Sequence, residues 1–566
     1  MLWNLDSIYN SLEEWKSDFF GLKTMIDFNT EDTKEILCDK NIKELLTIRE
    51  KEIRTAEKLY VYSKLKFDLD LCDDTNQRNY QQALELLVKV INRKEKMSRE
   101  IEKIKNTLND QAKHNEIIEK KLKVKTYNDK GKLDHFMQQL EFNKLSYRKI
   151  LNNTKNMLVN EDEFYTSLYS NDAFVRKSNF KNYHRYFFGV IDEVSELLIS
   201  QIKIYKELAS IQGFDSALTG VLNNDMLNKE FFIRFLKNIN QNISYFHKYI
   251  DNRKKCLEIE ELHSYDLYYS PERMLNDNIE TIDQALSLVK EALAPLGTEY
   301  QNIIEEITDR GLIHSEMSPN RRRGSYSIGS YDTKQFILLE WQNDIDGIHT
   351  LAHEIGHSVH STLSNEYQGY SDAGYSNFIG EVFALLNEVL VVNYLINNTE
   401  NPRKKREYIS YYIRKCIDKV FNPALFSEFE YWLHEQIDNS KELSSKDLSD
   451  KYYKVYQLFY GPHFTYDDEN AIEWVRIPHL FDAFYLYKYA AGYTIAISLY
   501  SKILQSDSDF VKKLINILKA GKTISVADFF EITGIEINEM NFMDDFFQEF
   551  DKQLYCMENT ILPKIL

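Results

Sequence analysis

The side chains best suited to bind a metal ion gather in one stretch, from Asp346 to Glu388. It contains His353-Glu354-Ile355-Gly356-His357, the H-E-x-x-H pattern of zinc hydrolases. Residues four apart on a helix lie on one face, so the two imidazoles can bind the same ion. Glu354, next to the first histidine, would flank a water on that ion. The pattern therefore predicts a metal-dependent hydrolase.

Four histidines on the predicted helix offer more than one pair with this spacing. His349, His353, His357 and His360 all fall on one side of a helical wheel. Between His349 and His353 the position of a general base is occupied by Thr350, whereas the next pair has Glu354 there. The pair His353 and His357 is therefore the predicted metal-binding pair.

A third ligand must come from further along the chain. A metzincin would have glycine and histidine where this sequence has His360 and Leu363, so that class is excluded. Of the downstream carboxylates, Glu366 is too close for the chain to leave one helix and return on another. Glu381 opens an apolar helical stretch and is the natural third ligand. Glu388, seven residues later on the same face, is a candidate to orient a ligand histidine.

The composition narrows the classes of function. The 566 residues carry 70 basic and 88 acidic side chains, a formal net charge of −18, which disfavours a general nucleic-acid or anionic-membrane binder. No targeting segment is apparent, and no run of about 18 or more apolar residues occurs. Five scattered cysteines predict neither a disulfide framework nor a thiolate zinc site. We therefore expect a cytoplasmic protein that binds neither nucleic acid nor membrane.

The elements that must position the site are mostly helices. No proline occurs before Pro271, and this half is rich in Glu, Lys and Leu, which predicts a long succession of helices. Residues 76–126 have apolar positions at three-to-four spacing and predict a helical hairpin. The best strand candidate is Phe336–Trp341. Its backbone edge would be free to pair with an extended peptide, or it would be an ordinary buried strand. The triplet 321–323 would meet a peptide carboxylate, or would simply be a basic surface run.

Further motifs give the chain a resemblance to a known family. They are the extended pattern H-E-x-G-H-x-x-H, Glu381 opening E-V-x-x-x-x-x-E, the segment Trp474–His479 and the following FYLYKYAAGY. The segments WNLDSIY near the N-terminus, RRRGSY and FILLEW also occur in the family's order. Together they resemble the oligoendopeptidase F branch of the thimet-oligopeptidase family over nearly the whole chain.

The resemblance implies a mainly α fold, with two helical lobes enclosing a deep substrate channel and a small β-sheet beside the active-site helix. We expect an N-terminal lobe of long helical hairpins over 1–190 and a catalytic domain over 191–566, with the H-E-x-x-H helix at 346–364. It also implies that a histidine and a tyrosine stabilise the oxyanion of peptide hydrolysis. These would be His479 and one or two of the tyrosines that follow it, namely Tyr485, Tyr487 and Tyr493.

The predicted function is hydrolysis of internal bonds in short, unfolded oligopeptides. One Zn²⁺ per chain would be held by His353, His357 and Glu381, and Glu354 would activate the zinc-bound water and return a proton to the leaving amine. Two alternatives stand beside this prediction: a zinc carboxypeptidase on a related helical fold, and a catalytically inactive helical protein that binds peptides. The sequence does not determine the oligomeric state.

Overall fold

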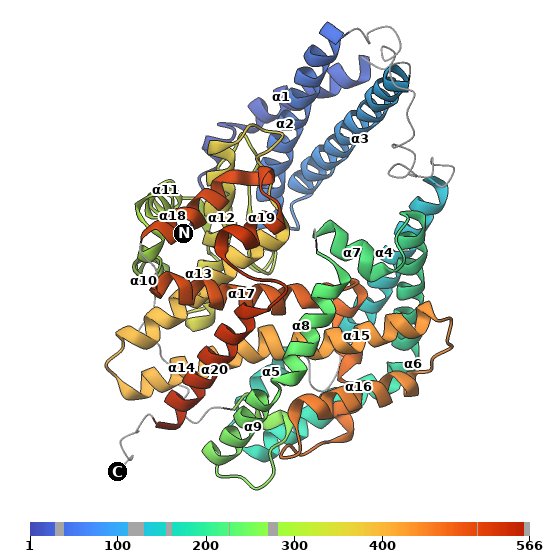
Figure 1. The fold of residues 1–566 in the computed structure, drawn as a ribbon. Coiled ribbons are helices and arrows are strands. Elements are labelled where there is room, and N and C mark those ends of the chain that lie inside the picture. The colour runs from blue at the N-terminus through green and yellow to red at the C-terminus, as the bar shows by residue number, and fades with distance from the viewer. Residues whose placement is uncertain are drawn as a thin grey trace. The chain divides into compact units, whose positions relative to one another are not determined.

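The computed structural model describes residues 1–28, 39–110, 130–153, 161–225, 227–269, 281–505 and 508–559. The chain forms two compact units, each assembled from three stretches of sequence. Unit 1 comprises Met1–Lys123, Asn276–Ser376 and Val511–Ile524; unit 2 comprises Val124–Leu275, Asn377–Phe510 and Ser525–Leu566. The helices of each are labelled in Figure 1. The predicted lobe boundary at residue 190 lies inside helix α6 (Ala173–Ile211).

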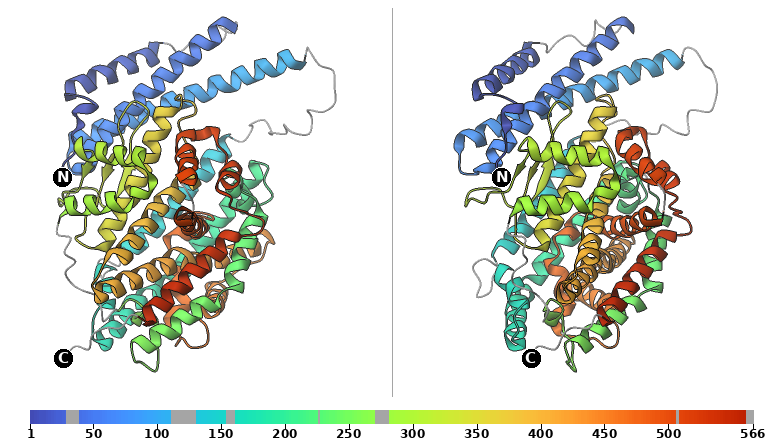
Figure 2. Two further views of the ribbon diagram at one scale, coloured as in Figure 1. Left: turned by 60° about the vertical axis from the view of Figure 1, so that its left-hand side comes forward. Right: turned by 90° about the vertical axis from the view of Figure 1, so that its left-hand side faces the viewer.

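Unit 1 begins with three long helices. Its helices are α1 (Leu12–Phe28), α2 (Asp39–Leu69), α3 (Asp74–Asp110), α10 (Ile282–Ala292), α11 (Thr298–Asp309), α12 (Ile345–Tyr367) and most of α18 (Ser508–Ala520). Helices α2 and α3 pack side by side as an antiparallel pair, drawn in blue in Figure 2. A helical hairpin is thus present, but α3 supplies one arm and α2 the other, because residues 74–110 form one continuous helix. The part of the predicted hairpin beyond residue 110 lies outside the described residues.

A three-stranded sheet in unit 1 carries helix α12. Its strands are β1 (Ile313–His314), β2 (Tyr326–Ile328) and β3 (Phe336–Leu338), in the order β1-β3-β2. β3 pairs parallel with β1, Ile313 opposite Ile337, and antiparallel with β2, Ser327 opposite Ile337. All of β3 is buried, so the predicted strand is confirmed as a central one. The hypothesis that its own edge is open to a peptide is wrong, because both edges are already paired.

The basic triplet in unit 1 is engaged in the fold. Arg321 is buried and donates hydrogen bonds to the carbonyl of Glu316 and to the sulfur of Met317. Arg322 forms an ion pair with Asp68, 3.5 Å long, and Arg323 forms one with Glu340, 3.1 Å long. Arg321 is thus a buried residue of the fold, whereas Arg322 and Arg323 are exposed and form ion pairs.

Unit 2 is a helical body. Its helices are α4 (Lys130–Asn153), α5 (Glu161–Leu168), α6, α7 (Ala217–Asn224), α8 (Lys229–Gln241), α9 (Ser244–Cys256), α13 (Asn377–Asn398), α14 (Pro402–Cys416), α15 (Asn422–Asp438), α16 (Ser445–Tyr460), α17 (Leu486–Gln505), α19 (Val526–Thr533) and α20 (Asn541–Asn559). A π-helical turn, η5 (Ile417–Phe421), joins α14 to α15, and the 3₁₀ segments η6 (Asp468–Arg476) and η7 (Pro478–Phe481) precede α17.

Helices α13 and α17 form the core of unit 2. They pack tightly because Gly492 has no side chain: a Cβ there would lie 3.1 Å from Cδ1 of Leu385. α13 is long and apolar enough to cross a membrane by length and composition, although Glu381, Asn387, Glu388 and Asn393 interrupt it. However, 89% of the apolar 18-residue segment of this helix is buried, as in a core helix. The mainly α fold with a small sheet is confirmed.

Candidate metal centre and active site

Helix α12 positions the H-E-x-x-H side chains in unit 1. It begins after Asp344, whose carboxylate accepts a hydrogen bond of 3.0 Å from the backbone N–H of Gly347, a helix N-cap. It packs on β2 and β3, and the hydroxyls of Ser327 and Ser358, 2.8 Å apart, join it to the sheet. A capped helix on a sheet therefore carries the two predicted ligand histidines.

The two predicted ligand histidines point toward the same position. Both are half-buried, and their Nε2 atoms lie 3.1 Å apart. Two Zn–N bonds of ordinary length at a tetrahedral angle would put the nitrogens about 3.3 Å apart. Glu354, between them in the sequence, is buried to 7% exposure. The spacing of the imidazoles fits a divalent metal ion.

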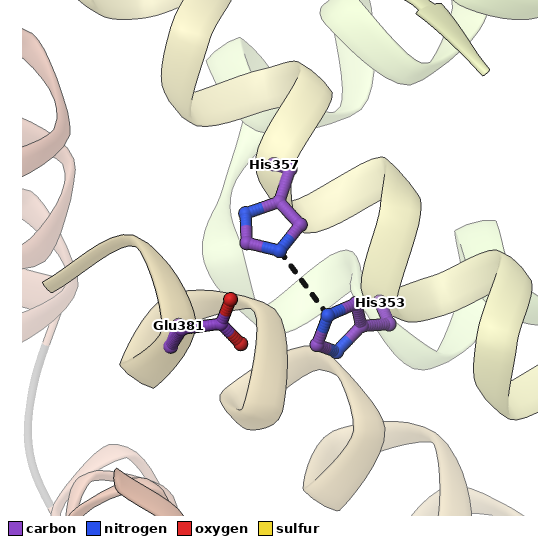
Figure 3. Close-up of side chains that lie close together, drawn as sticks. All are labelled: His353, His357 and Glu381. Carbon is purple, nitrogen blue, oxygen red and sulfur yellow. Dashed lines mark hydrogen bonds between the residues drawn. The ribbon is translucent and has the colours of Figure 1, made fainter. Parts of the chain in front are cut away.

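Glu381 completes the donor set. It lies in the second turn of α13 and is half-buried. One ligand atom from each of His353, His357 and Glu381 lies within 4.8 Å of the others. Figure 3 shows the three side chains close together. Two imidazoles and one carboxylate are the ligands of catalytic zinc sites that keep a fourth position open. The three predicted ligands are thus brought together.

His360 lies one turn beyond His357, on the same side of α12. Its ring is 1% exposed and stacks on Tyr375 at 3.6 Å between centroids and 12° between planes. The hydroxyl of Tyr375 lies 2.8 Å from that of Ser361. Burial, with a contribution from His357, lowers the pKa of His360 to about 3, so its imidazole is neutral at pH 7. The stacking packs His360 against Tyr375, in the segment that follows α12.

Glu388 forms an ion pair with a lysine on the π-helical turn. Its carboxylate is 3% exposed and lies 2.7 and 2.8 Å from Nζ of Lys419. The turn arises where Pro423 follows in a continuous helix, because proline clashes with the carbonyl four residues earlier, which is that of Lys419. The role predicted for Glu388, orienting a ligand histidine, stays a prediction, and its charge is balanced by Lys419.

A second cluster, in unit 2, contains His479, Tyr485 and Tyr489. The rings of His479 and Tyr485 are parallel, 5.7 Å apart, and the hydroxyl of Tyr489 donates to that of Tyr485 over 3.2 Å. Burial lowers the pKa of His479 although Asp482 opposes the shift, so the neutral ring offers one N–H donor at pH 7. Burial, Tyr485 and the carboxylate of Glu381 together raise the pKa of Tyr489. The cluster thus lies within electrostatic reach of Glu381.

The other two predicted tyrosines face the protein interior. Tyr487 is fully buried, and its hydroxyl donates to Asp225 over 2.8 Å. Tyr493 is also fully buried, near Cys416 and Glu388, and its pKa is raised well above the ordinary value by burial. Sequence reasoning missed Tyr489. A signal was available, since Tyr489 lies four residues after Tyr485 and so shares its helix face, whereas Tyr487 does not.

Known proteins resemble this chain over nearly its full length. The oligopeptidase PepF of Bacillus subtilis is 28% identical over 99% of this chain and 87% of that protein. A crystal structure from Chlamydophila abortus superposes with a TM-score of 0.86 at 23% identity, covering 99% of this chain and 98% of that one. Oligoendopeptidase-F from Enterococcus faecium superposes with a TM-score of 0.65 at 22% identity, covering 97% and 99%.

The resemblance stated from the motifs is confirmed by the family comparison. Residues 166–549 match Peptidase family M3, and this range contains α12, α13 and the segment that carries His479. The range also spans both groups of side chains described above, the three predicted ligands and the cluster of His479, Tyr485 and Tyr489. The chain is therefore a peptidase of the metal-dependent kind and belongs to Peptidase family M3.

Proposed function

We propose that this peptidase is a zinc-dependent endopeptidase that cleaves internal bonds of short, unfolded oligopeptides in the cytoplasm. The observation that carries the proposal is the pair of imidazole nitrogens 3.1 Å apart on α12, with the buried carboxylate of Glu354 between them in sequence. His353, His357 and Glu381 would hold one zinc ion. When bound, the ion lowers the pKa of a water molecule and polarises the scissile carbonyl.

The proton transfers fall to Glu354. It is next to a ligand histidine and is shielded from solvent, so its carboxylate accepts a proton from the attacking water and later donates it to the departing amine. Because one group carries both steps, its replacement by an amide removes the base and the acid together.

The developing charge on the former carbonyl oxygen needs hydrogen-bond donors from the protein. His479 and Tyr485 are the proposed donors. Tyr489 donates to the hydroxyl oxygen of Tyr485, which leaves the Tyr485 proton available to the substrate. Tyr487 is a poorer choice because its proton is already given to Asp225.

The test compares two glutamate-to-glutamine changes on the same helix. The zinc-loaded protein is incubated with an end-blocked peptide and the products are read by mass spectrometry. We expect internal cleavage by the wild type and by Glu366→Gln, whose side chain is exposed. Glu354→Gln should lose at least about 10²-fold in kcat while keeping its zinc.

Other outcomes would point elsewhere. Release of single C-terminal residues from an unblocked peptide, with the end-blocked peptide left intact, would support a carboxypeptidase. Peptide binding without any product would support an inactive binding protein. Near-native turnover by Glu354→Gln would refute the assignment of the base.

A further inference from the structure

The segment that carries the proposed oxyanion donors contains a left-handed residue. Phe484 has a φ of +51°, a conformation that residues with a side chain rarely adopt. It is the third residue of a turn closed by a 3.1 Å hydrogen bond from the N–H of Tyr485 to the carbonyl of Asp482. His479 lies just before this turn, and its carbonyl accepts from Asp482 over 3.0 Å. The turn therefore joins His479 to Tyr485.

Glu430 accepts a hydrogen bond from the backbone of this turn. It lies on α15, which packs against α17, and is 1% exposed. Its Oε1 accepts a hydrogen bond of 2.6 Å from the backbone N–H of Phe484. Its other oxygen, Oε2, has no hydrogen-bond partner among the described residues. The bond to the Phe484 N–H is thus the one polar contact of Glu430 in the described part of the chain.

Apolar contacts fix the ring of Phe484 in the same place. It is 1% exposed and lies edge-on to Phe232 at 5.6 Å, and tilted against His434 at 4.4 Å. Just upstream, Phe481 stacks on Tyr147 at 4.2 Å and its carbonyl accepts from Gln201 over 3.0 Å. Phe481, before the turn, and Phe484, within it, are thus both fixed by packing, and the backbone of Phe484 is also fixed by its hydrogen bond to Glu430.

The protonation state of Glu430 follows from its surroundings. Burial raises its pKa to about 8, with Asp482 adding to the shift and the Phe484 N–H opposing it. The carboxyl group is therefore mostly neutral at pH 7, and it offers the N–H a carbonyl-type acceptor. A glutamine would present the same acceptor in the same shape, whereas a leucine would present none.

We propose that Glu430 is a positioning residue for catalysis: it holds Phe484 in its left-handed conformation and so fixes His479 and Tyr485 relative to each other. The proposal rests on the proposed function, in which these two side chains donate to the oxyanion. It explains why a carboxyl group is buried next to this turn, since an apolar side chain would leave the N–H of Phe484 without this acceptor.

Kinetics of three variants on α15 test the proposal. Glu430→Gln should keep kcat within about threefold of the wild type. Glu430→Leu should lower kcat about 10- to 100-fold with KM within about threefold, because a small displacement of the donors affects the transition state more than substrate binding. The matched control is Leu433→Ala, a buried position on the same helix, which should lower stability and leave kcat unchanged.

A second pair separates backbone conformation from the ring. Phe484→Gly and Phe484→Ala both remove the ring, but only glycine adopts a positive φ without strain. Phe484→Gly should therefore retain at least about fivefold more kcat than Phe484→Ala. Because neither variant changes Glu430, this comparison still tests whether kcat depends on the left-handed conformation at residue 484 if Glu430→Leu fails to fold.

Hydrogen exchange gives a readout that does not depend on activity. The amide of Phe484 should be protected in the wild type and in Glu430→Gln, and exposed in Glu430→Leu. A folded Glu430→Leu protein with native kcat, an effect on KM alone, or equal activity of the two Phe484 variants would overturn the proposal. If the wild type does not cleave the end-blocked peptide, the proposed function fails, while unchanged protection of Phe484 in Glu430→Leu would refute the contact itself.

Discussion

Gly347, in the first turn of α12, has no space for an added methyl group. A Cβ built there would lie 2.0 Å from the backbone carbonyl oxygen of Gln342 and 3.0 Å from its carbon. Both are backbone atoms and cannot rotate away, so Gly347→Ala must displace either the chain at Gln342 or the first turn of α12.

The expected cost combines three effects. Forcing atoms into filled space costs about 1–3 kcal/mol. Displacing the turn weakens the cap from Asp344 to the Gly347 N–H, which is worth about 1 kcal/mol. Replacing a helical glycine by alanine stabilises the helix by about 1 kcal/mol, which offsets part of this cost. We therefore expect Gly347→Ala to lower the free energy of unfolding by about 1–3 kcal/mol.

The matched control is Gly189→Ala in the middle of α6. A Cβ there has nothing within 4 Å, so only the gain in helix propensity remains, about 0.5–1 kcal/mol in favour of the folded state. Urea unfolding followed by circular dichroism measures both variants. Opposite shifts of the midpoint at an unchanged slope are the expected result. If Gly347→Ala proved as stable as the wild type, the steric argument would be wrong.

Three further predictions concern the site and its support. Glu381→Ala should lose zinc affinity, measured by metal analysis after dialysis; stoichiometric zinc in that variant would exclude it as a ligand. Tyr489→Phe should lower kcat by about 10-fold or more, whereas Tyr487→Phe, which loses only its bond to Asp225, should mainly lower stability; the reverse order would favour Tyr487. Glu473 is buried, and its pKa is lowered to about 2 because Arg476 and His184 favour the charged carboxylate more than burial disfavours it. The charged Glu473 therefore stabilises the folded state fully above pH 4.5, and this stabilisation, on the order of 3 kcal/mol, is lost as the pH falls toward 2. In Glu473→Gln the free energy of unfolding should depend less on pH over that range.

The kernel of the site could be predicted from sequence because it depends on local geometry. The spacing of His353 and His357 on one helix determines that both imidazoles face the same way, and no tertiary contact is needed to infer it. Glu381 could be selected among three carboxylates by the same reasoning, since it follows a segment long enough to reverse direction. The absence of proline likewise indicated the helical N-terminal half.

Roles that depend on neighbours distant in sequence could not be inferred in this way. Tyr485, Tyr487, Tyr489 and Tyr493 are chemically equivalent in a list, and only packing separates them. The hydroxyl of Tyr487 donates to Asp225, Tyr493 is fully buried, and the hydroxyl of Tyr489 donates to that of Tyr485. Burial and partner decide whether a hydroxyl can serve a substrate.

The sequence by itself therefore determined the H-E-x-x-H pattern and the helical class of the fold, and it predicted Glu381 as the third ligand. All three follow from spacing along one or two helices. The tertiary structure alone decided the central position of β3, the pairing of Glu388 with Lys419 and the hold of Glu430 on Phe484. Each of these joins elements whose separation along the chain carries no periodic signal. A helix repeats its geometry every few residues and can be inferred from the chain, whereas contacts between elements exist only once the whole unit has packed.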